Sequence, residues 1–245
     1  MLIKLMKYDF KAMFRNMAPS FLAMFVLSIV CSFLTRIKLT NNTIFTLLII
    51  LSMFVFVGAS VLTVVLVVKR FVDSLLNNEG YFNFSLPVTT MSHIIAKVIN
   101  ALIWGILLSI ALFICFLISF IITGNLKDLI RAFEFIVRID ITDCVYLFRI
   151  LSLLALSITC LICKVYASYS VGHLFKRHTT ALAIAAFVIF TIIEVTFNPI
   201  TSIIKLPSTD ITNISFYLLH LVAIIGIIIY FFITWYILDR HLNLD

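Results

Sequence analysis

Few side chains in this chain could do chemistry inside an apolar environment, and two of them carry a charge. Lys164 and Glu194 each interrupt a strongly apolar stretch. A charge in such a stretch is costly, and its default interpretation is a residue on a transport or ion pathway. Glu194 lies close to the end of its stretch, where interfacial water is within reach. Lys164 has a stem long enough to extend to the membrane edge as an anchor. For both residues we therefore favour a structural role over transport.

Cysteine and histidine add little chemistry. Cys160 and Cys163 have the C-x-x-C spacing of redox proteins, but both lie in one apolar run, where packing is the simpler interpretation. The five histidines show no spacing typical of a metal site. None of the six glycines is followed by lysine, so the Gly-Lys pair of a phosphate-binding P-loop is absent. We expect no catalytic residue, metal or cofactor in this chain, and no enzymatic activity by itself.

The elements that must hold these residues are membrane spans. Of 245 residues, 63% are hydrophobic and 12% are charged, and the mean hydropathy is +1.21. Soluble domains carry about 25% charged residues, which excludes that class. The net charge of +7 is spread over many loops, which is typical of membrane orientation and not of a nucleic-acid site.

The pattern predicts an all-α polytopic membrane protein with a single transmembrane domain covering residues 1–245. A span needs about 20 apolar residues. We expect six of them, at 18–35, 44–68, 98–123, 150–171, 179–196 and 214–238. Residues 1–17 place Ile3, Met6, Phe10, Met13 and Met17 on one helical face and four cations on the other, which predicts a separate amphipathic helix lying in the membrane interface. The interval 124–149 predicts a second surface helix.

The cations predict the orientation. With the amino terminus inside, eleven of the 18 Lys and Arg residues fall on the cytoplasmic side. Cytoplasmic loops carry the excess of these residues. We therefore expect a multi-pass protein of a bacterial cell membrane with both termini in the cytoplasm.

The longest polar interruption is the segment 69–97, between the second and third spans. It contains two basic residues, an Asn-Asn-Glu-Gly break, a Leu-Pro-Val corner and a closing Lys97. Such a segment is too interrupted to span a bilayer, and we expect it to dock on a cytoplasmic partner. The residues expected at this contact are Phe71, Asp73, Leu75, Leu76, Glu79, Gly80, Tyr81, Phe82 and Pro87, with the apolar ones as anchors.

Residues 79–88, E-G-Y-F-N-F-S-L-P-V, with Lys97 resemble the E-G-Y-[LF]-x-F-[TS]-L-P-V…K segment of small permease subunits of type-2 ABC exporters from Gram-positive bacteria. Three further stretches are similar to parts of that family. They are the opening at 7–11, the basic turn at 172–178 and the ending at 236–245. Phe82 replaces the commoner Leu, and Arg240-His241 stands where Lys pairs are usual.

The resemblance implies six spans per subunit and two such subunits, identical or paralogous, with the pathway between them. It also implies a separate cytoplasmic ATPase dimer that binds ATP and Mg²⁺. The turn that resembles the second cytoplasmic contact contains His173, Lys176, Arg177 and His178.

Other functions stay open. An ion-coupled secondary transporter should show acids at mid-depth beside broken helices, and Glu194 with Asn198-Pro199 is the one candidate. An intramembrane enzyme lacks a paired nucleophile and base. A membrane immunity or structural protein without transport activity fits the composition equally well. Peptides, lipids and amphipathic drugs are all compatible with an apolar pathway.

Overall fold

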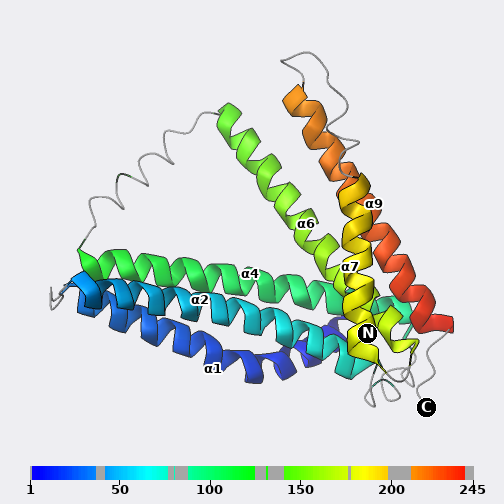
Figure 1. The fold of residues 1–245 in the computed structure, drawn as a ribbon, viewed down its shortest axis with the longest axis horizontal. Helices are drawn as coiled ribbons and strands as arrows, with labels where there is room; N and C mark the ends of the chain where they lie inside the picture. The colour runs from blue at the N-terminus through cyan, green and yellow to red at the C-terminus, as the bar shows by residue number, and fades with distance from the viewer. Residues whose placement is uncertain are drawn as a thin grey trace. The chain divides into compact units, whose positions relative to one another are not determined.

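A computed structural model of the chain describes residues 2–36, 42–76, 80, 88–124, 131, 141–175, 178–197 and 211–240. Those residues form helices and turns, with no strand among them (Figure 1). The α-helices are α1 (Leu2–Arg36), α2 (Asn42–Phe71), α4 (Thr90–Thr123), α6 (Ile141–His173), α7 (Thr179–Phe197) and α9 (Ile211–Arg240), and a short π-helix, η1 (Val72–Leu76), follows α2. Six helices are long and apolar enough to cross a membrane. The predicted all-α, multi-pass membrane fold is confirmed.

The helices are longer than the predicted spans. The helices α1, α4 and α6 have 35, 34 and 33 residues. At 1.5 Å per residue each measures roughly 50 Å, against a hydrocarbon core of about 30 Å. Gly124 follows α4 with a φ of 84°, the left-handed conformation that glycine adopts at a helix end.

The chain divides into two compact units, which we describe separately. The α1 unit comprises Met6–Val67 and Asn100–Ile141, and the α9 unit comprises Met1–Leu5, Val68–Ile99 and Thr142–Asp245. In the α1 unit, Met13 and Met17 of α1 pack on Trp104 of α4. Farther along the same two helices, the Ser28 hydroxyl donates to the Cys115 carbonyl at 3.1 Å, and the Ser32 hydroxyl donates to Ser119 at 2.9 Å. Small polar residues of this kind let transmembrane helices approach closely.

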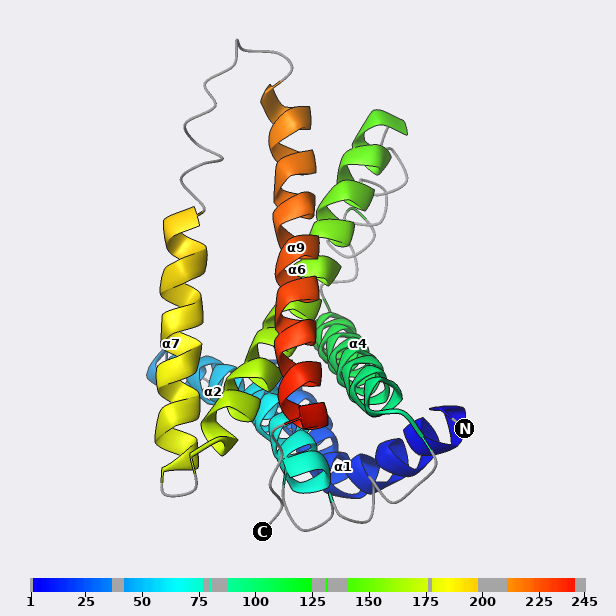
Figure 2. The ribbon, with the colours of Figure 1, turned by 90° about the vertical axis from the view of Figure 1, so that its right-hand side faces the viewer.

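The predicted break between an interfacial helix at 1–17 and a span at 18–35 is not observed. Instead, α1 runs without interruption through Pro19, the proline inside it. The views show that α1 bends within its length (Figure 2), which is how a helix accommodates a proline. The face predicted to meet lipid is partly covered, because Met13 and Met17 are 5% and 0% exposed. The amphipathic segment and the span therefore form one continuous, bent helix that packs on α4.

The α9 unit is built on α6 and α9, which run side by side in the same direction. The Ser152 hydroxyl oxygen lies 2.9 Å from Nε2 of His220. Nearby, the Arg149 guanidinium lies over the Tyr217 ring, 5.7 Å from its centroid. Farther along, a Cβ at Gly226 would lie 2.9 Å from the Cys160 sulfur, so glycine permits this close approach.

Helix α7 returns alongside α6 in the opposite direction. The turn between them depends on Gly172, where a Cβ would lie 2.5 Å from the Thr179 carbonyl oxygen and 2.8 Å from the Ala183 nitrogen. Ala183 and Ala186 are buried on the packed face of α7. Small residues thus bring the beginning of α7 tightly against the end of α6.

The polar segment predicted at 69–97 is shorter in the structure. Helix α2 and η1 extend to Leu76, and α4 begins at Thr90. Thr89 precedes α4, and its carbonyl accepts the Ser92 backbone N–H at 2.9 Å. Lys97 was expected to close the polar segment, but it lies within α4 and is 5% exposed. Buried apolar side chains at both ends of the segment explain why the helices continue into it. The predicted surface helix within 124–149 lies mostly outside the described residues, and its last part, from Ile141, belongs to α6.

Candidate functional site

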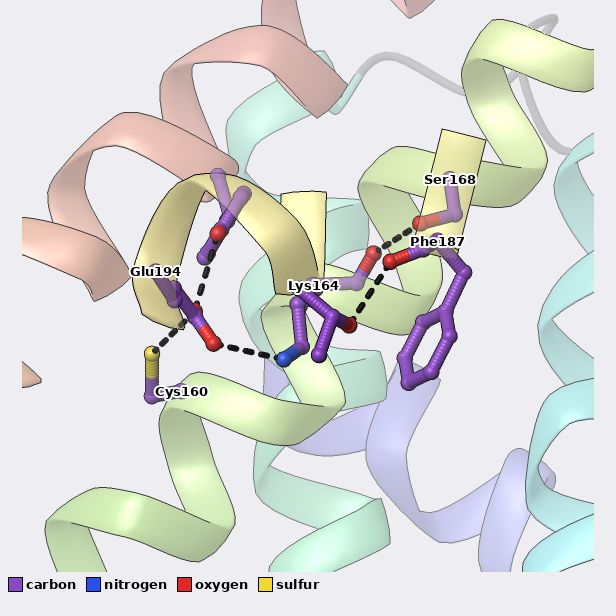
Figure 3. A network of polar contacts seen from close by, with 7 residues as sticks. Cys160, Lys164, Ser168, Phe187 and Glu194 are labelled. Atoms are coloured by element: carbon purple, nitrogen blue, oxygen red, sulfur yellow. Dashed lines mark hydrogen bonds and ion pairs between the residues drawn. The ribbon is translucent and has the colours of Figure 1, made fainter. Parts of the chain in front are cut away.

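The two charged residues that interrupt the apolar stretches form an ion pair. Nζ of Lys164, on α6, lies 2.7 Å from Oε2 of Glu194, on α7 (Figure 3). The Lys164 side chain keeps 7% of its surface exposed, whereas that of Glu194 keeps 33%. The Lys164 side chain is thus covered by the helices, and the Glu194 side chain is about one-third exposed.

A third helix completes the site. The Tyr230 hydroxyl, on α9, donates a hydrogen bond of 2.8 Å to Oε1 of Glu194. The Cys160 thiol is 4.0 Å from the same oxygen, which is a weak contact. One carboxylate therefore ties α7 to both α6 and α9. We call Lys164, Glu194 and Tyr230 the charged triad.

Aromatic rings border the charged triad. The Phe187 ring centroid lies 5.1 Å from Nζ of Lys164, within the range of a cation–π contact. The rings of Phe190 and Tyr230 lie 5.3 Å apart in a tilted arrangement. Close by, Cys163 and Ala167 of α6 pack with Tyr230 in one apolar cluster. The charges are therefore surrounded by rings and small apolar groups.

The structure adds an ion-pair partner to Lys164 and Glu194, for which edge positions were predicted. Lys164 precedes the last residue of α6 by nine positions, and Tyr230 precedes that of α9 by ten. Those spacings correspond to about 14–15 Å along the helices. The Lys164 ammonium group contacts Glu194. Glu194 is close to the end of α7, and it contacts Lys164 of α6 and Tyr230 of α9.

A second group of predicted residues lies around Tyr166 of α6. The Phe71 ring stacks on the Tyr166 ring with centroids 3.9 Å apart and planes 6° apart. The Tyr166 hydroxyl donates to the Lys97 carbonyl at 3.5 Å. Tyr166 therefore contacts the end of α2 and the beginning of α4, the two ends of the central polar segment. We call Phe71, Tyr166 and Lys97 the aromatic joint.

The predicted docking residues need a correction at this point. Phe71 and Leu75 are fully buried and Leu76 is 5% exposed. These side chains pack within the chain, so they cannot serve as exposed anchors for a partner. Gly80 is helical and buried, and Asp73 is half-buried. Outside the described residues are Glu79, Tyr81, Phe82 and Pro87.

The basic turn is partly described. His173 is half-buried at the end of α6, and His178 is exposed just before α7. Lys176 and Arg177 lie outside the described residues. The structure does not bring either histidine to the charged triad or to the aromatic joint.

Tyr230 and Tyr166 are the residues that the sequence analysis missed. Each is a tyrosine inside an apolar run, and a buried phenol needs a hydrogen-bond partner. That signal indicates a polar neighbour without identifying it. Within the described residues no group of three His, Cys, Asp or Glu side chains could hold a metal ion, and all five cysteines are free.

Comparison with known proteins gives no match. No protein-family model matches the sequence, and no curated protein or solved structure matches it significantly. Functional assignment therefore depends on the charged triad, the aromatic joint and the sequence motifs.

Proposed function

We propose that this chain is the transmembrane permease subunit of an ATP-binding-cassette exporter. It forms the translocation pathway as a dimer, with a second copy or a paralogous permease. A separate cytoplasmic ATPase, which holds ATP and Mg²⁺, drives transport. The aromatic joint is the observation that supports this proposal best.

The aromatic joint couples the polar segment mechanically to α6. A partner that pushes on the polar segment between η1 and α4 acts on both of its ends. Phe71, at the end of α2, and the Lys97 backbone, about two turns into α4, both contact Tyr166. A buried, stacked aromatic pair contributes about 0.5–1.5 kcal/mol beyond its area burial. Motion of the segment is therefore transmitted to α6 and, through the charged triad, to α7 and α9.

The roles of the predicted contact residues change accordingly. The buried side chains of Phe71, Leu75 and Leu76 hold the segment by packing within the chain. Docking on the ATPase belongs to Glu79, Tyr81, Phe82 and Pro87, the part that resembles the exporter family. The eleven-to-seven division of Lys and Arg supports a cytoplasmic position for this segment and for both termini.

An ion-coupled secondary transporter is the second candidate, and the charged triad favours it. An ionisable pair within spanning helices is typical of ion and proton pathways. The two candidates differ in their energy source. Export by the first needs ATP hydrolysis by a partner, whereas export by the second follows an ion gradient. A membrane immunity or structural protein is the third candidate. It would depend neither on ATP hydrolysis nor on an ion gradient.

The test is purification of the tagged chain from its own cells in lipid, followed by mass spectrometry and an ATPase assay. We expect a protein with a P-loop to co-purify and the complex to hydrolyse ATP. Substitution of the P-loop lysine in that partner should abolish hydrolysis. ATP turnover by the isolated chain, or export driven by an ion gradient without ATP, would contradict the proposal.

A further inference from the structure

Two buried polar atoms in the α1 unit have no hydrogen-bond partner among the residues that the structure describes. They are Oδ1 of Asn100 and Nε1 of Trp104, both on α4. The two residues are 2% and 1% exposed. A buried polar atom without a partner is costly, and the large majority of such atoms in proteins are paired with protein groups or with ordered water. The two atoms therefore point to a bound molecule.

Both residues lie on the face of α4 that meets α1. Asn100 and Trp104 are four positions apart, the spacing that places two side chains one above the other on a helix. Nδ2 of Asn100 donates to the Met6 carbonyl at 3.3 Å. The Trp104 ring stacks on the Phe10 ring of α1, with centroids 4.9 Å apart. One polar residue and one aromatic residue of α4 thus contact successive turns of α1.

The contact with Met6 also fixes which amide atom of Asn100 is left over. A carbonyl oxygen only accepts hydrogen bonds, so the atom that faces Met6 is the NH₂ group. Oδ1 points away from that contact and is an unused acceptor, whereas Nε1 of Trp104 is an unused donor. An acceptor and a donor therefore lie one helical turn apart beside the same contact between α1 and α4.

The pairing of one acceptor with one donor limits which molecule can bind. A cation is repelled by the indole N–H, and an anion is repelled by the amide oxygen, so neither ion suits both atoms. A molecule that donates and accepts at once suits both of them, and water is the smallest such molecule. Met13 and Met17 of α1 are buried and pack on Trp104, which favours a small ligand.

We propose that a water molecule is bound between α1 and α4, where it accepts the Nε1 hydrogen of Trp104 and donates to Oδ1 of Asn100. Buried water makes about three hydrogen bonds, and these two atoms supply two of them. The water extends the polar contact of Asn100 with Met6, so it helps to hold the amphipathic beginning of α1 on α4. The inference is independent of the proposed function, because it concerns only how two helices are joined.

Two other arrangements use the same residues. In the first, the Trp104 side chain rotates and its N–H donates directly to Oδ1 of Asn100. In the second, both atoms stay without a partner. The three arrangements differ in two measurable properties, which are the presence of water beside the indole N–H and the energetic coupling of the two residues.

The direct test is NMR of the Trp104 indole N–H in perdeuterated detergent micelles. The chain has two tryptophans, so Trp235→Phe leaves one indole signal. We expect a rotating-frame Overhauser cross-peak between this N–H and water, with the sign that distinguishes proximity from hydrogen exchange. Asn100→Leu should lose the cross-peak. A resolved indole signal without it in the Trp235→Phe protein, or its persistence at full strength in folded Asn100→Leu, would overturn the proposal.

A double-mutant cycle gives the energetic test. Asn100→Leu removes the acceptor, and benzothienylalanine at position 104 keeps the ring shape but replaces the N–H by sulfur. With a bridging water each change strands the other partner, so the sulfur analogue should lower the folding equilibrium constant roughly fivefold, and the double change should cost less than the sum. The lost bond to Met6 cancels in the cycle, because both proteins with Asn100→Leu lack it.

The two measurements together separate the three arrangements. Coupling with a water cross-peak supports the proposal. Coupling without the cross-peak indicates the direct bond and overturns it. If both atoms have no partner, the sulfur analogue stabilises the protein and the two changes are additive, which overturns it as well. Circular dichroism during heating reports whether each variant is folded, and the cross-peak in the Trp235→Phe protein needs no change at the site.

Discussion

At the scale of single residues, the charged triad is the most consequential feature. A buried ion pair is costly to leave half-complete, because removing one partner leaves an uncompensated charge. Lys164 is the more buried member and Glu194 connects three helices. The pairing of Lys164 with Glu194 could not be predicted from the sequence. Glu194 follows Lys164 by thirty positions across a turn, and hydropathy does not reveal how two apolar helices are rotated about their axes.

Glu194→Ala should therefore destabilise the protein by about 3–5 kcal/mol. Lys164→Ala/Glu194→Ala should cost less than the sum of its two single variants, since neither charge is then stranded. Tyr230→Phe should cost only about 1 kcal/mol, the value of one hydrogen bond. Chemical unfolding in mixed micelles measures each difference. Additive losses in the double variant would show that Lys164 and Glu194 do not interact.

At the scale of elements, small residues decide how closely the helices approach. A Cβ at Gly172 would clash with backbone atoms of Thr179 and Ala183, whereas a Cβ at Gly58 would meet nothing within 4 Å. The six spans were predictable, because apolar runs of sufficient length have one stable form in lipid. The continuity of α1 through Pro19 was not predictable, because it depends on packing against Trp104. The helical ends of the polar segment likewise depend on contacts distant in sequence.

Gly172→Ala should destabilise the α6–α7 turn by about 1–3 kcal/mol, as overpacking does. Gly58→Ala is the matched control. It should be neutral or slightly stabilising, because alanine is the better helix former. Thermal unfolding of both variants in the same detergent compares them. Equal stability of the two variants would mean that the α6–α7 contact is looser than the structure shows.

At the scale of the whole molecule, the six candidate spans and the distribution of cations predict a topology with both termini in the cytoplasm. Cys144 is exposed at the beginning of α6, while Cys31, Cys115 and Cys163 are buried. A thiol reagent that cannot cross membranes should therefore label Cys144 in intact cells. In a cysteine-free background, Asn78→Cys should react only after the cells are opened. Labelling of position 78 from outside would reverse the topology and remove the docking surface from the cytoplasm.

In the proposed function, a separate ATPase drives this chain through the aromatic joint. The most direct measurement is substrate-stimulated ATP hydrolysis by the reconstituted complex of permease and ATPase. Tyr166→Phe keeps the ring on Phe71 and loses one long hydrogen bond of 3.5 Å, so it should retain most of the stimulation. Tyr166→Ala removes the ring and should abolish stimulation while the complex still assembles. Wild-type stimulation in an assembled Tyr166→Ala complex would contradict the account.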